Sequence, residues 1–329
     1  MSKILLTGVT GFVGSHMAEY LLSEGHDVYG GARWRAPIDN VRPFLHLIHM
    51  TDIDIRDSTS IINMIRSIKP EYIFHLAAQS FVPSSFTAPG ETIFTNVIGT
   101  LNILEAVKQL GLDCVVQIAG SSEEYGYVTP TPEETPIKET NQLKPLSPYG
   151  VSKVACDLLA QQYHRSYGLK TVITRAFNHE GERRGKPFVT SNFAWQIAMI
   201  EQGLQEPVIK VGNLDAFRDF TDVHDMVKAY WYAATGCEYG EPYNICSGIA
   251  WKIRDMLDFL ISLSTVKGIK VEFEQNRMRP SDVPLLLGDY SKFYNQTGWR
   301  PEIPFENTLG RILKYWRSFD LRIPTPSEA

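Results

Sequence analysis

The chain has 329 residues, of which 43% are hydrophobic and 21% charged, and its formal net charge is −5. This composition is typical of a globular protein that is large enough to bury a core without disulfides or metals. The acidic balance gives no overall field that would attract nucleic acid or an anionic membrane surface. We therefore expect neither as a partner, so an anionic ligand would need local cations and helix ends.

Four cysteines lie far apart in the sequence, with neither a C-x-x-C pair nor a histidine cluster: Cys114, Cys156, Cys237 and Cys246. This pattern predicts reduced, buried thiols and no metal site. The short apolar run near the N-terminus is broken at Gly8 and lacks the h-region of a secretion signal. Since no other apolar run approaches membrane-spanning length, we expect a cytoplasmic protein.

The first half of the chain alternates strand and helix signals, namely short apolar runs and segments with apolar residues at helical spacing. The predicted strands are 3–7, 27–32, 45–49, 72–76, 114–119 and 171–175, and the predicted helices are 12–23, 58–68, 92–110 and 149–167. This alternation predicts βαβ units in an α/β fold, a doubly wound and mostly parallel sheet that is covered on both faces.

After Phe177 the alternation loosens and predicts a smaller lobe that adds a wall to the binding site. The predicted helices there are 193–203, 223–235, 253–264 and 305–317, and the predicted strands are 208–211 and 269–273. We expect residues 1–176, with about 212–247, to form the main domain, and residues 177–211 and 248–329 to form the smaller lobe.

Residues 8–14 read G-x-x-G-x-x-G directly after the first predicted strand and open a helix. Gly8 permits the tight turn, Gly11 lets the backbone approach a pyrophosphate, and Gly14 lets helix and strand pack closely. The free N–H groups of the helix N-terminus favour an anion. The main domain is therefore predicted to be a Rossmann domain that binds a dinucleotide through Gly8, Thr10, Gly11, Phe12, Val13 and Gly14.

The end of the second predicted strand distinguishes NADP from NAD. An NAD-binding protein usually places an acidic residue there to hold the ribose hydroxyl. This chain instead has Arg33 and Arg35, with no acidic residue before Asp39. The two guanidinium groups suit the 2′-phosphate of NADP. A solvated arginine pair is the alternative interpretation, but the segment favours NADP over NAD.

Tyr149 and Lys153 are four residues apart near the start of a predicted helix, so they share one face. The Ser147-Pro148 pair before them is typical of a helix start. A nearby ammonium lowers the pKa of a phenol. Tyr149 could therefore exchange a proton with a sugar hydroxyl while a hydride moves to nicotinamide.

The segment after the fifth predicted strand adds a hydroxyl and two carboxylates at the same edge of the sheet. Ser121 can hydrogen-bond the reacting hydroxyl, and Glu123 can act as acid and base. Neighbouring side chains in an extended segment point in different directions. We therefore expect Glu124 to be a surface or supporting carboxylate and not a second acid–base group.

Together these residues resemble the extended short-chain dehydrogenase/reductases that modify nucleotide sugars. Within them the chain is similar to GDP-mannose 4,6-dehydratase and to its close relative, the GDP-4-keto-6-deoxy-mannose reductase. The resemblance extends from the N-terminus to about Arg317. Further segments that carry it are 76–82 (LAAQSFV), 177–180 (FNHE), 211–216 (VGNLDA), 218–220 (RDF) and 279–283 (RPSDV).

Two subfamilies compete within this resemblance. Residues 183–185 (RRG) and 188–190 (FVT) resemble the dehydratase, where the reductase usually has a Gly-Pro-Gly-type loop. Residues 121–126, 219–223 and 243–248 resemble the reductase, and the chain is shorter than most such dehydratases. Ser121 replaces the dehydratase threonine but keeps its hydroxyl. The resemblance favours the dehydratase over the reductase, and the intact catalytic set argues against a non-catalytic NADP-binding scaffold.

The resemblance implies a hydro-lyase that converts GDP-mannose, or a related GDP-sugar, into the GDP-4-keto-6-deoxy sugar through transient reduction of NADP+. Tyr149 would deprotonate the hydroxyl on sugar carbon 4. Glu123 would remove the proton on carbon 5 and return one to the departing hydroxyl on carbon 6. Ser121 and Lys153 would orient and polarise the substrate.

The resemblance also implies the ligand contacts and an assembly. Beyond the glycine loop and Arg35, the cofactor would contact Arg33, Asp54, Ile55, Leu76, Ala77, Ala78, Gln79, Ser80, Tyr149, Lys153, His179 and Arg184. The GDP-sugar would contact Ser121, Ser122, Asn178, Asn192, Arg218, Arg279 and Asp282, several of them in the smaller lobe. The family implies a homodimer or homotetramer.

Overall fold

The computed structural model describes residues 1–277 and 283–322. Seven parallel strands of this part of the chain form one large sheet in the order β10-β6-β5-β4-β1-β2-β3. The α/β fold with a mostly parallel, doubly wound sheet is thereby confirmed. The strands are β1 (Lys3–Thr7), β2 (Asp27–Ala32), β3 (His49–Asp52), β4 (Tyr72–His75), β5 (Val115–Ala119), β6 (Lys170–Ala176) and β10 (Pro242–Ile245).

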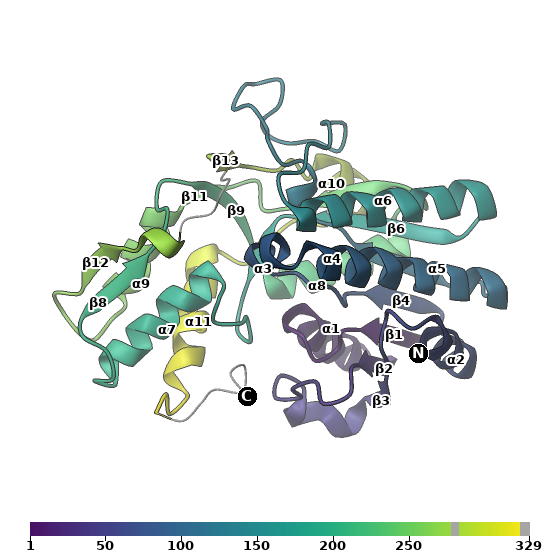
Figure 1. The fold of residues 1–329 in the computed structure, drawn as a ribbon, viewed down its shortest axis with the longest axis horizontal. Coiled ribbons are helices and arrows are strands. Elements are labelled where there is room, and N and C mark those ends of the chain that lie inside the picture. The colour runs from purple at the N-terminus through teal and green to yellow at the C-terminus, as the bar shows by residue number, and fades with distance from the viewer. Residues whose placement is uncertain (278–282, 323–329) are drawn as a thin grey trace.

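Two hydrophobic clusters cover the two faces of this sheet, because successive side chains of a strand point to opposite sides. In β1, Ile4 and Leu6 belong to one cluster and Leu5 to the other. The first cluster packs α1 (Phe12–Ser23) and α8 (Val223–Gly236) on the sheet. The second packs the other three long helices, seen at the right of Figure 1: α2 (Ser58–Ile68), α5 (Gly99–Leu110) and α6 (Pro148–Tyr167).

A smaller lobe lies beside the large sheet, at the left of Figure 1, around its own hydrophobic cluster. Its central strand β9 (Phe217–Asp222) pairs with three short strands, β7 (Asn178–Glu180), β11 (Ala250–Lys252) and β13 (Leu285–Leu286). A second sheet and three helices complete it: β8 (Val208–Val211), β12 (Lys270–Phe273), α7 (Val189–Glu201), α9 (Ile253–Ser262) and α11 (Phe305–Arg317). Within the predicted segment 212–247, β9 therefore belongs to the smaller lobe, whereas α8 and β10 belong to the large sheet. The division of the chain into two domains at the predicted boundaries stays a prediction.

The third strand lies later in the chain than the sequence predicted. The apolar stretch 45–49 is mostly a 3-10 helix, Arg42–Leu47, which starts at a proline and packs Phe44 into the core. β3 follows at the edge of the sheet, and its residues are exposed. The apolar pattern therefore marked the packed turn and not the exposed edge strand.

The long helix predicted over 92–110 is interrupted. It consists of α4 (Pro89–Ile93), a π-helical turn at Phe94–Ile98 and α5. Asn96 lies in the widened turn, where its amide accepts a hydrogen bond from Gln79 N–H (2.8 Å) and donates to Gln79 O and Ser152 Oγ. Side-chain bonds to a neighbouring segment thus accompany the π turn, as they often do near functional sites. The short helices α3 (Val82–Thr87) and α10 (Ser291–Thr297) were also not predicted.

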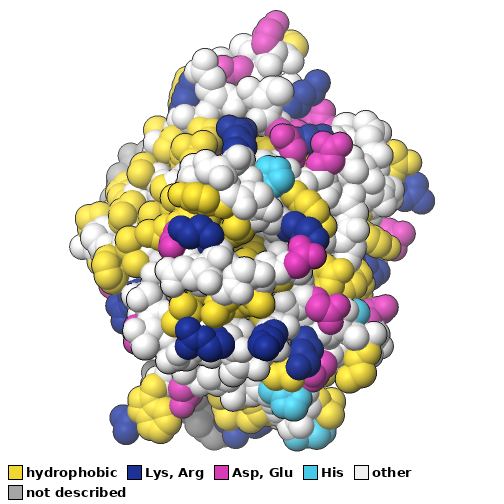
Figure 2. Space-filling model, turned by 90° about the vertical axis from the view of Figure 1, so that its right-hand side faces the viewer, with side chains coloured by type: hydrophobic (Ala, Val, Ile, Leu, Met, Phe, Trp, Pro, Cys, Tyr) yellow, Lys and Arg dark blue, Asp and Glu magenta, His cyan; other side chains and the backbone are white. Residues whose placement is uncertain are grey.

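The four cysteines are buried and unpaired, and no described helix is long and apolar enough to cross a membrane. Figure 2 shows one face of the molecule, on which Lys and Arg side chains lie among Asp, Glu and apolar ones.

Replacement of Gly14 by Ala tests the packing of α1 against the first loop. A Cβ at Gly14 would lie 2.1 Å from Gly8 O, so we expect the free energy of unfolding to fall by about 2 kcal/mol or more. Gly310→Ala in α11 is the control, because no atom of the described residues lies within 4 Å of its Cβ and alanine favours a helix by about 1 kcal/mol. Urea unfolding measures both, and equal losses would contradict this packing argument.

Candidate active site

A cleft of about 1470 Å³ runs along the carboxyl edge of the large sheet and under the smaller lobe. Its lining includes the residue that follows each of five strands, namely Gly8, Arg33, Leu76, Gly120 and Phe177. β1 and β4 are neighbours, so the strand order reverses between them. Open parallel sheets bind their ligands at such a reversal.

The glycine loop has the geometry of a pyrophosphate cradle. Gly8 has φ +72°, and a Cβ on it would lie 2.9 Å from Ala77 Cα, so the two turns touch. Gly11 is the N-cap of α1, and no described side chain caps that helix end. The nearest atom to a Cβ on Gly11 is Gly8 O at 3.2 Å. The free N–H groups of this helix end, together with Gly11, fit an approaching phosphate.

One threonine fixes the neighbouring loop to the sheet. Thr7 Oγ1 accepts hydrogen bonds from Leu76 N–H and Ala77 N–H, both at 3.2 Å, and lies 2.8 Å from His75 Nδ1. Its own proton is thus directed to His75, which must be unprotonated at Nδ1. Burial lowers the pKa of His75 to about 3, so the imidazole stays neutral and the loop that begins at Leu76 stays in place.

The two arginines that favoured NADP are placed differently. Both side chains are exposed, but Arg33 lines the cleft, whereas Arg35, which has φ +60°, is not among the lining residues described. Asp54 and Ile55 also line the cleft. Asp54 Oδ2 lies 2.6 Å from Arg56 Nη2, and this bond lowers the pKa of the carboxyl. Arg56 lines the cleft too, although no sequence motif pointed to it.

The predicted catalytic residues come together on one wall of the cleft, which we call the phenol wall: Ser121, Glu123, Tyr149 and Lys153. α6 starts here because Ser147 Oγ accepts Gly150 N–H (3.0 Å) and a proline follows Ser147. A Cβ on Gly150 would lie 2.6 Å from Glu123 O. The helix start is therefore packed directly on the turn that carries Glu123.

Burial raises the pKa of the Tyr149 phenol, although its hydrogen bond with Ser121 and the charge of Arg184 oppose the rise. This differs from the expectation that Lys153 lowers that pKa. Lys153 Nζ donates to Ala119 O at 2.6 Å and lies 5.8 Å from the centre of the tyrosine ring, and burial lowers the pKa of its own ammonium. The chain alone therefore holds Tyr149 as a neutral phenol.

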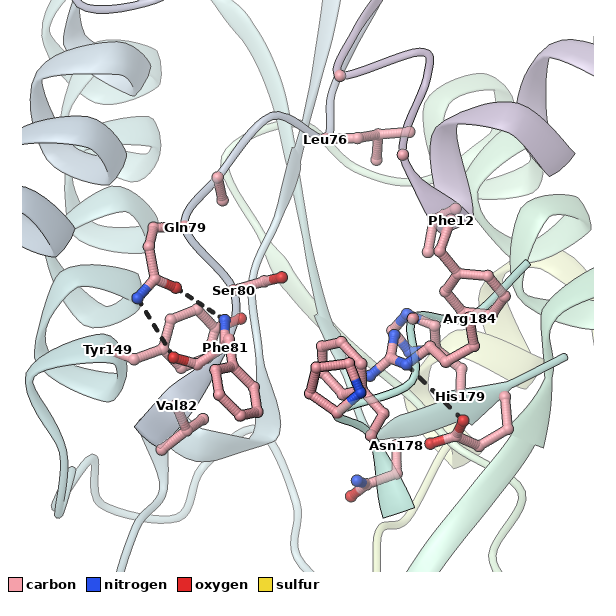
Figure 3. A pocket seen from close by; sticks show the side chains of 18 of the residues that line it. Phe12, Leu76, Gln79, Ser80, Phe81, Val82, Tyr149, Asn178, His179 and Arg184 are labelled. Carbon is pink, nitrogen blue, oxygen red and sulfur yellow. Dashed lines mark hydrogen bonds and ion pairs between the residues drawn. The ribbon is translucent and has the colours of Figure 1, made fainter. Parts of the chain in front are cut away.

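The opposite wall is aromatic and cationic, and Figure 3 shows it facing Tyr149 across the opening. The Arg184 guanidinium lies 3.7 Å from the centre of the Phe188 ring and 4.9 Å from that of Phe12. His179 stacks on Phe12, and burial and the charge of Arg184 lower its pKa to about 4. Such a slot, with planar groups opposite a phenol, fits a flat heterocycle.

The remaining cofactor-side predictions, Ala78, Gln79 and Ser80 with Thr10 and Val13, also line the cleft. On the substrate side, Ser122, Asn178, Asn192 and Arg218 do so. Arg279 and Asp282 lie outside the described residues. Besides Arg56, sequence reasoning missed three cations of the lining, Lys210, Arg183 and Arg277. Of these, only Arg183 lies in a quoted motif. Arg277 Nη1 donates to Asn192 Oδ1 at 3.0 Å, so these two residues of the cleft lining hold each other in place.

Comparison with known proteins identifies the family. A family model described as GDP-mannose 4,6 dehydratase matches residues 5–312. The chain belongs to the GDP-mannose 4,6-dehydratase family. It is 33% identical to a GDP-6-deoxy-D-mannose reductase of Pseudomonas aeruginosa, over 96% of this chain and 97% of the reductase. It is also 33% identical to a GDP-mannose 4,6-dehydratase of Vibrio cholerae, over 94% and 92% of the two chains.

The structure comparison agrees with this family. RMD from Pseudomonas aeruginosa, solved in complex with NADPH, superimposes with a TM-score of 0.82 at 31% identity, over 97% of this chain and 99% of RMD.

The two sequence alignments differ in their gaps. The alignment to the reductase runs over 316 residues, and 96% of the 329 residues here is also about 316. The alignment to the Vibrio dehydratase runs over 351 residues, but 94% of this chain is only about 309. This chain therefore has almost no gaps in its alignment to the reductase, but gaps of about 42 positions in its alignment to the Vibrio dehydratase.

The different positions of Arg33 and Arg35 predict different effects on cofactor binding. We expect Arg33→Ala to raise the dissociation constant of NADP about 30-fold or more and that of NAD hardly at all, because a charge-assisted bond to phosphate contributes about 2 kcal/mol. Arg35→Ala is the matched control and should leave both constants nearly unchanged. Fluorescence titration measures them, and equal effects of the two variants would contradict the assignment.

Proposed function

We propose that this protein is a nucleotide-sugar 4,6-dehydratase that converts GDP-mannose, or a related GDP-sugar, into the GDP-4-keto-6-deoxy sugar with NADP as its cofactor. The observation that carries the proposal is the phenol wall, in which Tyr149, Ser121 and Glu123 share one side of the cleft and face the slot of Phe12 and Arg184. A proton acceptor, a hydrogen-bonding hydroxyl and a carboxylate are what oxidation at carbon 4 and elimination across carbons 5 and 6 require.

The cofactor would lie along the carboxyl edge of the sheet. Its pyrophosphate would rest on the helix end at Gly11, its 2′-phosphate beside Arg33, and its nicotinamide in the slot between Tyr149 and Arg184. When bound, the oxidised cofactor supplies a reversible hydride acceptor and a positive charge beside the phenol.

The chain's own residues would move the protons. Tyr149, ionised beside the bound cofactor, would take the proton of the sugar hydroxyl on carbon 4. The Ser121 hydroxyl, which hydrogen-bonds Tyr149, would hold the phenol oxygen in line. The Lys153 ammonium, held by Ala119 O, remains 5.8 Å from the centre of the Tyr149 ring, where it would help to orient and polarise the substrate.

Glu123 would act at carbons 5 and 6. It sits in the 3-10 turn Ser122–Glu124, where its backbone N–H donates to Ser121 Oγ at 3.2 Å. The ketone formed at carbon 4 acidifies the proton on carbon 5, which Glu123 removes. Glu123 would then return that proton to the hydroxyl that departs from carbon 6 as water, so one carboxylate serves as base and as acid. The proton taken from the carbon 4 hydroxyl balances the one that carbon 5 regains when hydride reaches carbon 6.

A second candidate is the NADPH-dependent reductase of the GDP-4-keto-6-deoxy sugar. The alignment to the Pseudomonas reductase, in which this chain has almost no gaps, favours it. The reductase needs only the proton transfer by Tyr149 and has no use for an acid–base group at carbon 5. The presence of Glu123 in the phenol wall is therefore the reason to place the dehydratase first.

We further propose that the protein is cytoplasmic. We also propose that it assembles as a homodimer or a homotetramer, the two states that the family resemblance implies. Four buried, unpaired thiols support a reducing compartment.

The two candidates differ in what they do without added reductant. We expect the purified protein to convert GDP-mannose into a 4-keto product with NADP+ and without net consumption of cofactor, because the hydride leaves carbon 4 and returns to carbon 6. Mass spectrometry of the product and absorbance at 340 nm measure this. If NADPH is consumed only when the 4-keto sugar is supplied, the reductase is the correct function. Tyr149→Phe is the control in both assays and should bind NADP but lose nearly all turnover.

Glu123→Gln separates the two activities in one variant. The amide keeps the size of the side chain but cannot take a proton, so we expect dehydratase turnover to fall about 100-fold or more. Any reduction of the 4-keto sugar should change by less than about threefold, since Tyr149 is untouched. Single-turnover assays with each substrate measure this, and an unchanged dehydration rate would exclude Glu123 as the acid–base group.

A further inference from the structure

Glu124, the neighbour of the proposed acid–base residue, lies behind the phenol wall. Its side chain is fully buried, so of the two positions that the sequence left open the surface one is wrong and the supporting one remains. Glu124 Oε1 accepts the Ser121 backbone N–H at 2.7 Å, and Ser121 Oγ in turn accepts Glu123 N–H. A Cβ on Gly120 would lie 2.7 Å from that same Oε1. The carboxyl thus fills the space directly behind the turn that carries Ser121 and Glu123.

The other oxygen of Glu124 faces a second buried carboxyl. Arg175 Nε lies 2.8 Å from Asp157 Oδ2 and 3.4 Å from Glu124 Oε2, and neither acidic side chain is exposed. Arg175 Nη1 donates instead to the Tyr125 hydroxyl and to Glu139 O. Among the described residues, Glu124 Oε2 has no hydrogen-bond partner. One guanidinium therefore lies between two carboxyls, and of these two it hydrogen-bonds only that of Asp157.

A proton on Glu124 resolves this arrangement. One cation balances one carboxylate, and a second uncompensated charge in a water-free site is costly. Burial, followed by the charge of Asp157, raises the pKa of Glu124 well above its usual value. Since Oε1 is the acceptor for Ser121 N–H, the proton belongs on Oε2, where it can be donated to Asp157.

We propose that Glu124 is a positioning residue for the proposed reaction: as an uncharged carboxylic acid it anchors the Ser121 backbone, and through the Ser121 hydroxyl it fixes the Tyr149 oxygen. This inference rests on the proposed function, which supplies the reaction that is positioned. Glu124 would not touch the substrate. Its carboxyl would act from behind the phenol wall, through its hydrogen bond with the Ser121 backbone N–H.

The uncharged state matters because charged and titratable groups face Glu124 from several elements. α6 presents Tyr149, Lys153, Cys156 and Asp157, β6 presents Arg175, and Tyr125 follows Glu124 in the chain. A negative charge at Glu124 would disfavour the phenolate of Tyr149 and strengthen the hold on the Lys153 proton. The acid form avoids both effects while it keeps the hydrogen bond to Ser121.

Two variants separate the anchor from the charge. Glu124→Gln keeps an oxygen for Ser121 N–H and an N–H₂ group for Asp157, so it imitates the protonated acid. Glu124→Leu has similar bulk but no acceptor. We expect the Gln variant to keep kcat within about threefold of the unmodified protein with the same pH profile, and the Leu variant to lose about 30-fold or more in kcat. KM and the dissociation constant of NADP should change less than twofold in both.

Equal kcat in the Leu variant and the unmodified protein would overturn the proposal. So would parallel losses of kcat, cofactor affinity and melting temperature in the Leu variant, which indicate a general structural role. A Gln variant that loses activity as the Leu variant does would show that the carboxylate charge is needed, and it too would overturn the proposal.

A measurement without substrate tests the proton itself. A carboxyl whose pKa is raised by folding stabilises the native state most below its unfolded pKa of about 4.5, and this advantage is lost as the pH rises towards the folded pKa. The free energy of unfolding of the unmodified protein, relative to the Gln variant, should therefore fall between pH 4.5 and neutral pH. A flat or rising difference would show an ionised Glu124. This result holds even if GDP-mannose proves not to be a substrate, so the two proposals can fail separately.

Discussion

The proposed chemistry depends on one phenol, that of Tyr149, which is buried away from water. Burial keeps Tyr149 protonated in the chain by itself, and only Ser121 and Arg184 work against that effect. Bringing a cation up to the phenol would favour the phenolate. A tyrosine that ionises only next to a bound cationic ring would couple proton transfer to the presence of an oxidised cofactor. Under this proposal, Tyr149 would not be ionised while no oxidised cofactor is bound.

Burial also shifts the pKa values of the groups in the wall opposite the phenol. Burial lowers the pKa of Arg184 and of His179, and the histidine stays neutral near physiological pH. The Arg184 guanidinium is spread over Phe188 and Phe12 and forms a 3.7 Å ion pair with Glu180. Planar, partly compensated groups can stack on a flat ligand without imposing a full charge on it. In the proposed reaction the two walls would have different tasks: the Arg184 wall would orient the nicotinamide ring, and the phenol wall would exchange a proton.

Local signals in the sequence predicted the elements that carry the site. The glycine loop fixes where β1 ends and α1 begins, and Ser147 with a following proline marks the start of α6, so Tyr149 and Lys153 were placed correctly on the cleft. Long-range packing was not predictable in this way. The burial of Glu124 depends on Asp157 and Arg175, which come from other elements. The raised pKa of Tyr149 and the lining cations Arg56 and Lys210 depend likewise on the folded arrangement.

The proposed dehydratase and reductase reactions share some residues of the phenol wall and differ in their use of another. Both use Tyr149 at carbon 4, but only elimination uses Glu123. The turn that bears Glu123 is also the turn that bears Ser121, and Glu124 ties it to the buried Arg175 and Asp157. A change at the half-buried, cleft-lining Glu123 can therefore remove one reaction and leave the other intact. A change at the buried Glu124 would displace Ser121, which both reactions need. Glu123 is therefore the position at which the two activities can diverge.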